Sequence, residues 1–378
     1  MKVLIFNTLY YPYKVGGAEV SVQLLAEGLI KKGHEVRVIC LHPGKTRKQD
    51  RINNVDVVYL PLKNIYWPFD KTRRSKLKKL LWHVVDIANF FMVKSIDSEL
   101  ASFQPDLVHT NNISGFSVLL WRVVKKRNIK LIHTARDYYL FHPNSTLFRK
   151  GKNMSVKNYS VYFWSLFKKR YTRYVDGFIG ISNYIVDLHK ENGFFEKSKF
   201  TSIYNPIPIP AFKQKKIDSN SINVGFIGRL SEEKGFYEFC EISKKYTSKK
   251  FNFIAAGSPN SGSDFSSIQE KAELCNVSLL GFSTLEEFLS IVDVVIFPIK
   301  WQEPFGRSVV ECVLANKIVF SSSVGGLIEL KEKLPIFDLN KIDEFFLDES
   351  SLLEKTTLVN GFYSDNDSVS DTFVFYGK

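Results

Sequence analysis

Short apolar runs alternate with amphipathic stretches along most of the chain. Val3–Phe6 is the first run, and the stretch from Ala18 to Lys32 has apolar residues near helical spacing, with Gly33 where a helix-ending glycine belongs. Further strand-like runs of the first half are Val36–Cys40, Val55–Leu60, Leu107–His109, Lys130–His133 and Gly177–Ile181. This alternation predicts an open parallel sheet with helices on both faces.

The pattern restarts after a proline-rich segment, Asn205–Asp218, which we interpret as a linker. A helix is predicted at Glu232–Tyr246, and the strand-like runs of this half are Val224–Ile227, Phe251–Ala256, Val277–Leu280, Val294–Phe297 and Ile318–Ser321. The sequence therefore predicts an α/β protein with two Rossmann-like, doubly wound domains, at residues 1–205 and 206–345, and a tail at 346–378. Ligands of such sheets bind beyond the carboxyl ends of the strands.

Composition supports a globular protein, since 44% of the 378 residues are apolar and 24% are charged. The four cysteines, Cys40, Cys240, Cys275 and Cys312, lack the spacing of a disulfide framework or a zinc site. There is no run of 18 apolar residues, and the N-terminus lacks the long apolar region of a signal peptide. We expect a cytoplasmic protein.

The net charge of +13 is unevenly distributed. In residues 1–205 the basic residues outnumber the acidic ones by more than two to one, whereas acidic residues are in excess beyond residue 205. This asymmetry suggests that the first half faces a polyanion or an anionic membrane surface.

The strongest chemical signal follows the run that ends at Phe297. A loop leads to Gly306, where a helix is predicted to begin, and the unpaired N–H groups of a helix N-terminus form a suitable seat for a diphosphate. Phe305, Gly306 and Arg307 are therefore candidate residues for binding a diphosphate-containing donor substrate.

Two glutamates flank this helix start. Glu303 lies on the loop, where it can hold sugar hydroxyls, and Glu311 lies more than a turn into the helix, where it can accept hydrogen bonds from a ribose diol. Two glutamates eight residues apart are common by chance. Their position around a strand-to-helix junction favours a functional interpretation.

A second signal follows the run that ends at Ile227. Arg229 and Lys234 lie on the loop and early helix beyond a glycine, Gly228. An arginine fork and a lysine point charge together suit the neutralisation of a departing diphosphate, although isolated basic residues are usually surface cations.

A third signal is the Gly16-Gly17 pair after the first strand. Glycines at this position allow a left-handed turn and a close approach of the backbone to a phosphate, but a tight turn without a ligand explains them equally well. The GxGxxG pattern is absent here, so NAD binding is not supported.

Together these motifs resemble the retaining family-4 glycosyltransferases of the GT-B fold. The resemblance runs in order from about residue 2 to residue 330 and ends with Gly325-Gly326 and Glu329. It implies two facing Rossmann-like domains, with the nucleotide-sugar donor bound by the second and the acceptor mainly by the first. It also implies metal-independent transfer with retention at the anomeric carbon.

The resemblance assigns a role to each donor-side residue. It implies that Arg229 and Lys234 neutralise the leaving diphosphate, that Glu303 contacts the donor sugar, and that Glu311 holds the ribose. Gly17 would approach the phosphate from the opposite domain. The family also has a helical segment that crosses back to the first domain, and here Phe345–Leu353 is a candidate helix in the tail.

The acceptor side departs from the family pattern. His109-Thr110-Asn111 stands where relatives often have His-x-His, and Arg136-Asp137 where they often have His-Asp. Asn111 can hydrogen-bond but cannot transfer a proton near neutral pH. We therefore take Asp137 as the better acceptor-side candidate, with Asn111, Arg136 and His109 beside it; His109 suits a core position equally well.

Two basic stretches rich in aromatic residues suggest a membrane partner. Lys71–Phe91 and Tyr159–Tyr174 mix lysines and arginines with apolar residues at helical steps, as expected for docking on anionic headgroups. Burial of these apolar faces within the first domain is the alternative. Nucleic acid is a less favoured partner, because no nucleic-acid-binding signature accompanies the charge.

The sequence thus predicts a metal-independent enzyme without a cofactor that moves a hexose from a nucleotide-diphosphate sugar to an acceptor. We favour a UDP-sugar as the donor and a lipid-linked saccharide as the acceptor. The favoured setting is capsule or O-antigen synthesis, with the protein peripheral on the inner face of the plasma membrane. The alternatives are a non-lipid acceptor, such as nucleic acid or a small molecule, and a catalytically silent scaffold.

Overall fold

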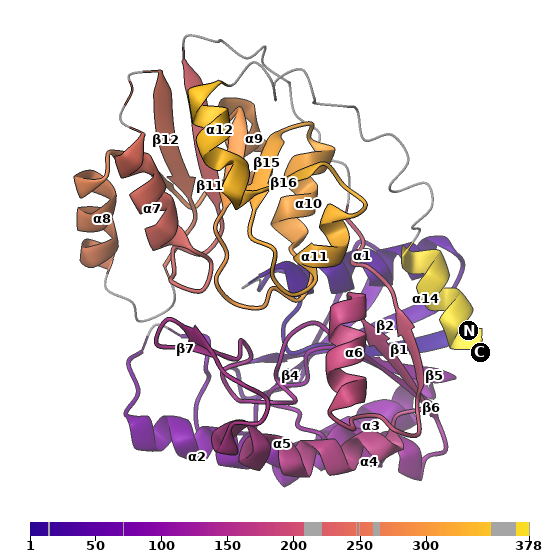
Figure 1. Cartoon of the computed structure of the whole chain (residues 1–378). Coiled ribbons are helices and arrows are strands. Elements are labelled where there is room, and N and C mark those ends of the chain that lie inside the picture. Colours follow the sequence, from indigo (N-terminus) through magenta and orange to yellow (C-terminus); the bar gives the residue numbers. More distant parts are fainter. Residues whose placement is uncertain are drawn as a thin grey trace. The chain divides into compact units, whose positions relative to one another are not determined.

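The computed structural model describes residues 1–13, 16–70, 72–207, 221–246, 248, 250–259, 265–348 and 368–377 (Figure 1). The chain forms two compact units. The first comprises Met1–Leu147, Met154–Pro206 and Asn366–Lys378, and the second comprises Phe148–Asn153 and Ile207–Asp365. From residue 208 onward the predicted linker lies outside the described residues, as do residues 349–353 of the predicted tail helix.

The first unit is built on an eight-stranded sheet in the order β10-β9-β6-β5-β1-β2-β4-β3. Its strands are β1 (Lys2–Phe6), β2 (Glu35–His42), β3 (Lys48–Ile52), β4 (Val55–Pro61), β5 (Leu107–Thr110), β6 (Lys130–Ala135), β9 (Gly177–Gly180) and β10 (Lys199–Ser202). Its helices are α1 (Gly17–Lys31), α2 (Lys76–Ile87), α3 (Phe90–Phe103), α4 (Leu119–Lys126), α5 (Tyr159–Tyr171), η1 (Thr172–Tyr174), α6 (Asn183–Glu191) and α14 (Ser368–Gly377). All neighbouring strands are parallel except β3 and β4.

The second unit has a six-stranded parallel sheet in the order β13-β12-β11-β14-β15-β16. Its strands are β11 (Ile222–Ile227), β12 (Phe251–Ala256), β13 (Val277–Gly281), β14 (Val294–Phe297), β15 (Ile318–Ser321) and β16 (Ile336–Asp338). Its helices are α7 (Phe236–Lys245), α8 (Phe265–Leu274), α9 (Leu285–Ile291), α10 (Arg307–Leu314), α11 (Leu327–Lys331), η2 (Leu339–Lys341) and α12 (Ile342–Leu347). A hairpin of β7 (Phe148–Arg149) and β8 (Lys152–Asn153) also belongs to this unit.

The predicted fold class and every strand predicted from an apolar run are confirmed. The prediction missed β3, β10, β16 and the β7–β8 hairpin. The predicted helix Glu232–Tyr246 begins too early, because Gly235 has a left-handed φ of +83° and α7 starts only at Phe236. The single helix suggested by the apolar steps up to Phe91 is two helices, α2 and α3, separated at Ala88–Asn89.

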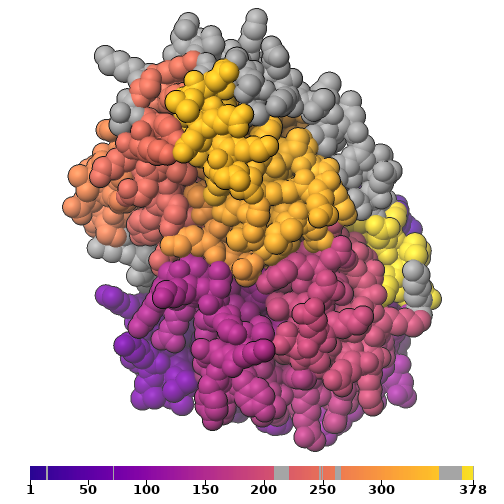
Figure 2. All heavy atoms as spheres, viewed as in Figure 1, coloured from indigo at the N-terminus to yellow at the C-terminus, as the bar shows by residue number. Residues whose placement is uncertain are grey.

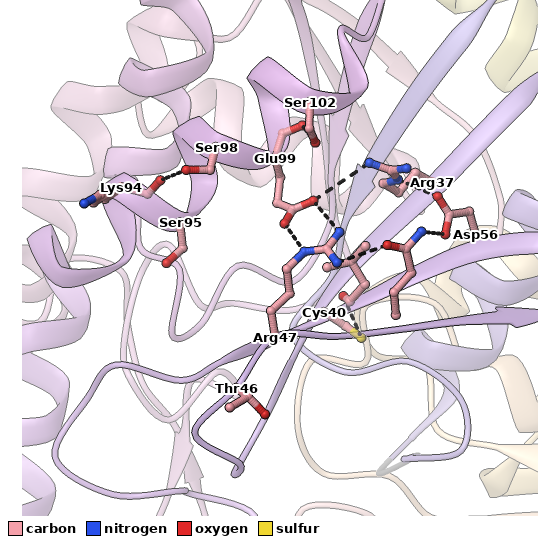
Figure 3. Close-up of polar contacts among 12 residues, drawn as sticks. Arg37, Cys40, Thr46, Arg47, Asp56, Lys94, Ser95, Ser98, Glu99 and Ser102 are labelled. Carbon is pink, nitrogen blue, oxygen red and sulfur yellow. Dashed lines mark hydrogen bonds and ion pairs between the residues drawn. The ribbon is translucent and has the colours of Figure 1, made fainter.

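The β3 edge of the first sheet is fixed by a network of charged side chains, drawn in Figure 3. Glu99 of α3 is buried, and its two carboxylate oxygens accept hydrogen bonds from Nε and Nη2 of Arg47 at 2.5 and 3.2 Å. Arg37 of β2 approaches the same carboxylate at 3.9 Å and pairs with Asp56 of β4 at 2.5 Å. Each buried charge therefore has a partner, which gives this cluster a structural role.

The C-terminal helix α14 completes the core of the first unit. Phe375 and Tyr376 are buried among residues of the sheet, including Ile132 of β6 and Ile179 of β9. Lys130 Nζ donates to the Tyr376 carbonyl at 2.7 Å, and the ring of Phe373 stacks on His34 at a centroid distance of 4.5 Å. In Figure 2 this helix forms the bright yellow patch at the surface.

Candidate active site

The order of strands in the second sheet reverses at one point. From β11 the chain adds β12 and β13 on one side and then β14, β15 and β16 on the other, so the order reverses between β11 and β14. Ligands of doubly wound sheets bind outside the carboxyl ends of the strands at such a reversal. The loops after β11 and β14 carry the two strongest sequence motifs, so the structure brings these motifs together.

Lys234 and Glu303 form the centre of this site. The Lys234 ammonium donates to Oε2 of Glu303 at 2.6 Å, and the indole Nε1 of Trp301 donates to the same oxygen at 3.0 Å. Glu303 is only 7% exposed, and Lys234 Nζ lies 4.9 Å from the centroid of the Trp301 ring. The site thus presents a cation suited to phosphate oxygens beside a carboxylate suited to sugar hydroxyls.

The loops that carry these residues are joined through their backbones. The Glu233 carbonyl accepts hydrogen bonds from the N–H groups of Lys300 and Trp301 at 3.1 and 3.3 Å. A Cβ atom on Gly235 would lie 1.8 Å from the carbonyl oxygen of Pro298. Glycine is therefore required at this crossing for both its left-handed φ and the close approach.

Arg229 lies on the same loop as Lys234, nearer to β11. Its side chain is 41% exposed, and its Nη2 lies 3.7 Å from Oε1 of Glu233. The structure therefore places both predicted diphosphate ligands at the carboxyl end of β11.

The predicted helix start at Gly306 is confirmed. Gly306 has a φ of +91° and precedes α10, whose first residue, Arg307, donates from Nε to Oε1 of Glu311 at 2.6 Å. Burial raises the pKa of Glu311, and the neighbouring Arg307 opposes this shift. Phe305 is 1% exposed, so its side chain belongs to the core and only its backbone can face a ligand.

Residues after β15 hold the Glu303 loop. Gly325 has a φ of +56°, and a Cβ atom there would lie 2.3 Å from the Glu303 carbonyl oxygen. Gly326 N–H donates to that carbonyl at 2.8 Å, and Gly325 N–H donates to Oε1 of Gln302 at 2.8 Å. Trp301 and Gln302 were not among the residues predicted from the sequence. A tryptophan next to a glutamate is nevertheless a usable signal, because a buried indole N–H needs a partner.

The Gly16-Gly17 pair differs from the left-handed turn that the sequence suggested. Gly16 is extended, with a φ of −159°, and its N–H donates to Oε2 of Glu19 at 2.9 Å. Gly17 is the first residue of α1. The expectation of a left-handed turn is therefore wrong at Gly16, because helix α1 begins directly at this pair.

On the acceptor side, the structure places His109 in the core of the first unit. His109 is 1% exposed, and its ring nitrogens bond to the Tyr376 hydroxyl at 2.6 Å and to Thr134 Oγ1 at 2.7 Å. Burial, followed by the charge of Arg136, lowers the pKa of His109 to about 3. These contacts make His109 a neutral core residue, so the core position is correct and the acceptor contact predicted from the sequence is not.

Asn111 and Arg136, in contrast, lie together. Arg136 Nε donates to Asn111 Oδ1 at 2.9 Å, and its Nη1 donates to Oδ1 of Asn205. Asn111 is 1% exposed, and its Nδ2 has no hydrogen-bond partner within the described ranges of the chain. The asparagine and the arginine thus form one polar group in the first unit.

Asp137 follows directly and is partly exposed. Its Oδ1 accepts the Tyr139 N–H at 2.8 Å. Burial raises the pKa of this carboxyl to about 6, while the Tyr139 N–H and the Lys168 ammonium lower it and Glu19 raises it. The carboxylate is therefore poised to titrate just below neutral pH.

Comparison with known proteins identifies the family. The model of Glycosyltransferase Family 4 matches residues 15–209, and that of Glycosyl transferases group 1 matches residues 210–333. The chain belongs to glycosyltransferase family 4 and is a glycosyltransferase of the GT-B fold. Its relatives include an uncharacterized 42.6 kDa protein in the cps region of Klebsiella pneumoniae, 46% identical over 91% of both chains. An uncharacterized glycosyltransferase of Methanocaldococcus jannaschii is 24% identical over 87% of this chain and 82% of the relative.

Solved structures share the fold at low sequence identity. Sucrose-phosphate synthase from Thermosynechococcus elongatus aligns with a TM-score of 0.73 at 15% identity, over 99% of this chain and 98% of the other. Anabaena HepE in complex with UDP and glucose aligns with a TM-score of 0.70 at 17% identity, over 98% and 96%. No helix in the described part of the chain is long and apolar enough to cross a bilayer.

Proposed function

We propose that this glycosyltransferase moves a hexose, with retention, from a nucleotide-diphosphate sugar to a lipid-linked saccharide in capsule-type or O-antigen-type polysaccharide synthesis. The observation that carries the proposal is the convergence of Arg229, Lys234 and Glu303 at the carboxyl ends of β11 and β14, beside the start of α10. The HepE complex with UDP favours a UDP-sugar, and the relative in the cps region favours polysaccharide synthesis.

In the proposed reaction, the bond between the anomeric carbon and the diphosphate oxygen breaks, and its electron pair leaves with the nucleotide diphosphate. Arg229 and Lys234 stabilise the charge that develops on this leaving group, so neither a metal nor a cofactor is required. The acceptor hydroxyl oxygen bonds to the same face of the anomeric carbon, and its proton passes to the departing diphosphate. Glu303 orients the sugar hydroxyls, and Glu311 accepts hydrogen bonds from the ribose.

The first unit supplies the acceptor contacts in this proposal. Asp137 accepts a hydrogen bond from an acceptor hydroxyl, and the polar group of Asn111 and Arg136 binds neighbouring hydroxyls. A partly exposed carboxylate with a pKa near 6 is ionised at neutral pH, which is the form that this contact requires.

A thermal-shift panel of nucleotide diphosphates and nucleotide sugars tests the donor site. A ligand at about 100 times its dissociation constant adds about 2.7 kcal/mol to the free energy of unfolding. We expect the largest shift with UDP compounds, its loss in Lys234→Ala, and its retention in Lys245→Ala, a surface lysine of α7. A chain that responds to none of these compounds is not a nucleotide-sugar enzyme, and the silent-scaffold alternative would then hold.

Product analysis tests the chemistry. We expect NMR of the product to show the anomeric configuration of the donor and the rate to persist in EDTA. An inverted product, or activity that EDTA abolishes and a divalent cation restores, contradicts the proposed mechanism.

The proposed setting is an anionic membrane surface, reached through an exposed apolar face. We define the α2–α5 face as Leu77, Leu80, Leu81 and Val84 of α2 with Tyr159, Tyr162, Phe163 and Leu166 of α5, all between 46% and 83% exposed. The helices are neighbours, since the rings of His83 and Trp164 lie 6.3 Å apart, and both run along the same side of the first unit in Figure 1.

Charge complementarity favours lipid as the partner of this face. Exposed basic residues border the apolar side chains, namely Arg73, Lys76, Lys78, Lys79, Arg170 and Arg173. Each cation near an anionic bilayer contributes about 1 kcal/mol to binding. We expect co-sedimentation with vesicles of phosphatidylglycerol and phosphatidylcholine, but little with phosphatidylcholine alone.

A double variant, Leu80→Asp with Phe163→Asp, should abolish this co-sedimentation, whereas Phe282→Asp, at an 86% exposed position of the second unit, should not. Dimerisation of the chain through this face, or a DNA gel shift without vesicle binding at the same salt, contradicts the membrane setting.

A further inference from the structure

Helices α2 and α5 bury charged residues and expose apolar ones. On α5 the buried positions are Val161, Ser165 and Lys168, while the opposite side forms part of the α2–α5 face. On α2 the buried positions are Trp82 and Asp86. Lys168 is only 2% exposed, although lysine is almost never fully buried without a partner.

The buried lysine is held by one residue of the loop that follows β6. Lys168 Nζ donates to the Tyr139 carbonyl oxygen at 2.6 Å and lies 3.5 Å from the centroid of the Tyr139 ring. The Tyr139 hydroxyl in turn donates to the carbonyl oxygen of Asp86 at 3.4 Å. The Asp86 carboxylate accepts the Gly115 N–H, so the last turn of α2, the β6 loop and α5 meet at one polar junction.

The same loop residue positions Asp137. Tyr139 donates its N–H to Asp137 Oδ1 and gives its carbonyl oxygen to Lys168, so one peptide segment joins the carboxylate to the ammonium. Turns inside the loop, such as Phe141 N–H to the Tyr138 carbonyl at 2.9 Å, keep this segment compact.

We propose that Lys168 is a positioning residue, which fixes the Asp137 carboxylate through Tyr139 and ties the loop after β6 to helix α5 of the α2–α5 face. The inference rests on the proposed function, because it takes Asp137 as an acceptor contact. Burying an ammonium group costs stability, so the presence of the buried Lys168 beside the loop of Asp137 favours a role in placing that carboxylate.

The charged and titratable groups around the junction set the expected pH effects. Glu19 of α1, Lys168 of α5 and the Tyr139 N–H act on Asp137, while Asp86 of α2 and Asp137 itself act on Lys168. Burial lowers the pKa of Lys168 to about 8, and the two carboxylates oppose this shift. The ammonium is thus charged at neutral pH and lowers the pKa of Asp137.

His83 of α2, with His142 and Lys79 acting on it, is a further titratable group near Lys168. Burial, then Lys168 and His142, lowers the pKa of His83 to about 4. His83 is therefore neutral near pH 6, where Asp137 titrates, and does not compete with the effect of Lys168 on Asp137.

The test compares Lys168→Met, Lys168→Arg and the control Lys169→Met in the full-length chain, with steady-state kinetics and a pH profile. For Lys168→Met we expect at least a tenfold loss of kcat/KM for the acceptor, an unchanged KM for the donor, and an acid limb shifted to higher pH. Lys168→Arg should keep the acid limb of the wild type, and Lys169→Met should match the wild type throughout.

Two further measurements separate the possible failures. If Lys168→Met does not fold, Lys168→Gln replaces it, because the amide keeps a donor for the Tyr139 carbonyl without the charge; the same shift is expected. If Asp137→Asn keeps full activity, the acceptor role of Asp137 fails, and the positioning role fails with it. If Asp137→Asn is inactive while the neutral Lys168 variants keep the wild-type acid limb and kcat/KM, only the inference about Lys168 is overturned.

Discussion

The Lys234 ammonium lies 2.6 Å from Oε2 of Glu303, on the carboxylate oxygen that also accepts the Trp301 indole N–H. A residue from the loop after β11 and one from the loop after β14 thus hold each other across the reversal point of the second sheet. This pairing keeps an otherwise costly buried carboxylate in place and holds both groups at the same edge of the sheet.

Replacing Glu303 with glutamine should lower the catalytic rate without lowering the stability of the fold. The amide oxygen still accepts the Trp301 N–H, but the negative charge next to Lys234 and the second strong acceptor for sugar hydroxyls are lost. We expect kcat to fall by about 10²- to 10³-fold, as for loss of one preorganised electrostatic contact. The melting temperature should stay within a few degrees of the wild type, and activity above a tenth of wild type would contradict the role of Glu303.

Substitution of Gly235 by alanine should disrupt the donor loops. The left-handed φ of +83° costs about 1–2 kcal/mol for a residue with a Cβ atom, and the contact with the Pro298 carbonyl adds to it. Gly281→Ala is the matched control, since its φ is +70° but its Cβ would meet nothing within 4 Å. Urea unfolding should show the larger loss for Gly235→Ala, together with a higher KM for the donor; equal losses would argue against the tight crossing.

Removal of the Tyr376 hydroxyl should destabilise the first unit. Tyr376→Phe leaves a buried ring nitrogen of His109 without its partner, at a cost of about 1–3 kcal/mol. Tyr159→Phe serves as the control because Tyr159 is 83% exposed. Hydrogen exchange of the amides of β5 and α14 should speed up only in Tyr376→Phe, and unchanged protection would show that the bond contributes little.

The buried Asp86 predicts a specific pH dependence of stability. Burial raises its pKa from 3.8 to about 6, against the opposing effects of Lys168 and of the hydrogen bonds to the carboxylate. The folded chain therefore holds this proton more tightly than the unfolded chain, and stability is lost as pH rises from about 4 to 6. The loss is about 3 kcal/mol for a shift of this size.

The comparison of wild type with Asp86→Asn isolates this effect, because the amide oxygen can still accept the Gly115 N–H. Between pH 4 and 7, the free energy of unfolding of the wild type should fall relative to that of the variant. A constant difference across this range would show that Asp86 does not titrate as its burial requires.

The donor site was predictable because its residues lie in two compact blocks of sequence. Each block follows an apolar strand, so the topology of a doubly wound sheet brings Arg229, Lys234 and Glu303 to one edge. Contacts made by residues far apart in sequence were not predictable. The Tyr376 hydroxyl that engages His109 comes from 267 positions further along the chain, and no local pattern reveals such a partner.

The missed elements also have physical reasons. The β3 sequence Lys48–Ile52 is mostly polar and exposed, so it lacks the apolar pattern of a strand; its pairing with β4 and the Arg47–Glu99 contact hold it in place. The apolar steps of α2 and α5 were visible, but periodicity alone does not say which face is buried. Only the structure shows that Asp86 and Lys168 occupy the inner side.

The position of α14 has a consequence for biosynthesis. The sheet of the first unit is complete by Ser202, yet its core lacks Phe375 and Tyr376 until residues 368–377 have been translated. At typical elongation rates, synthesis of the intervening second unit takes roughly tens of seconds. During that interval the nascent chain presents the apolar surface of Ile132 and Ile179 to solvent, so chaperone binding on the ribosome should be strongest over this window and should end when α14 docks.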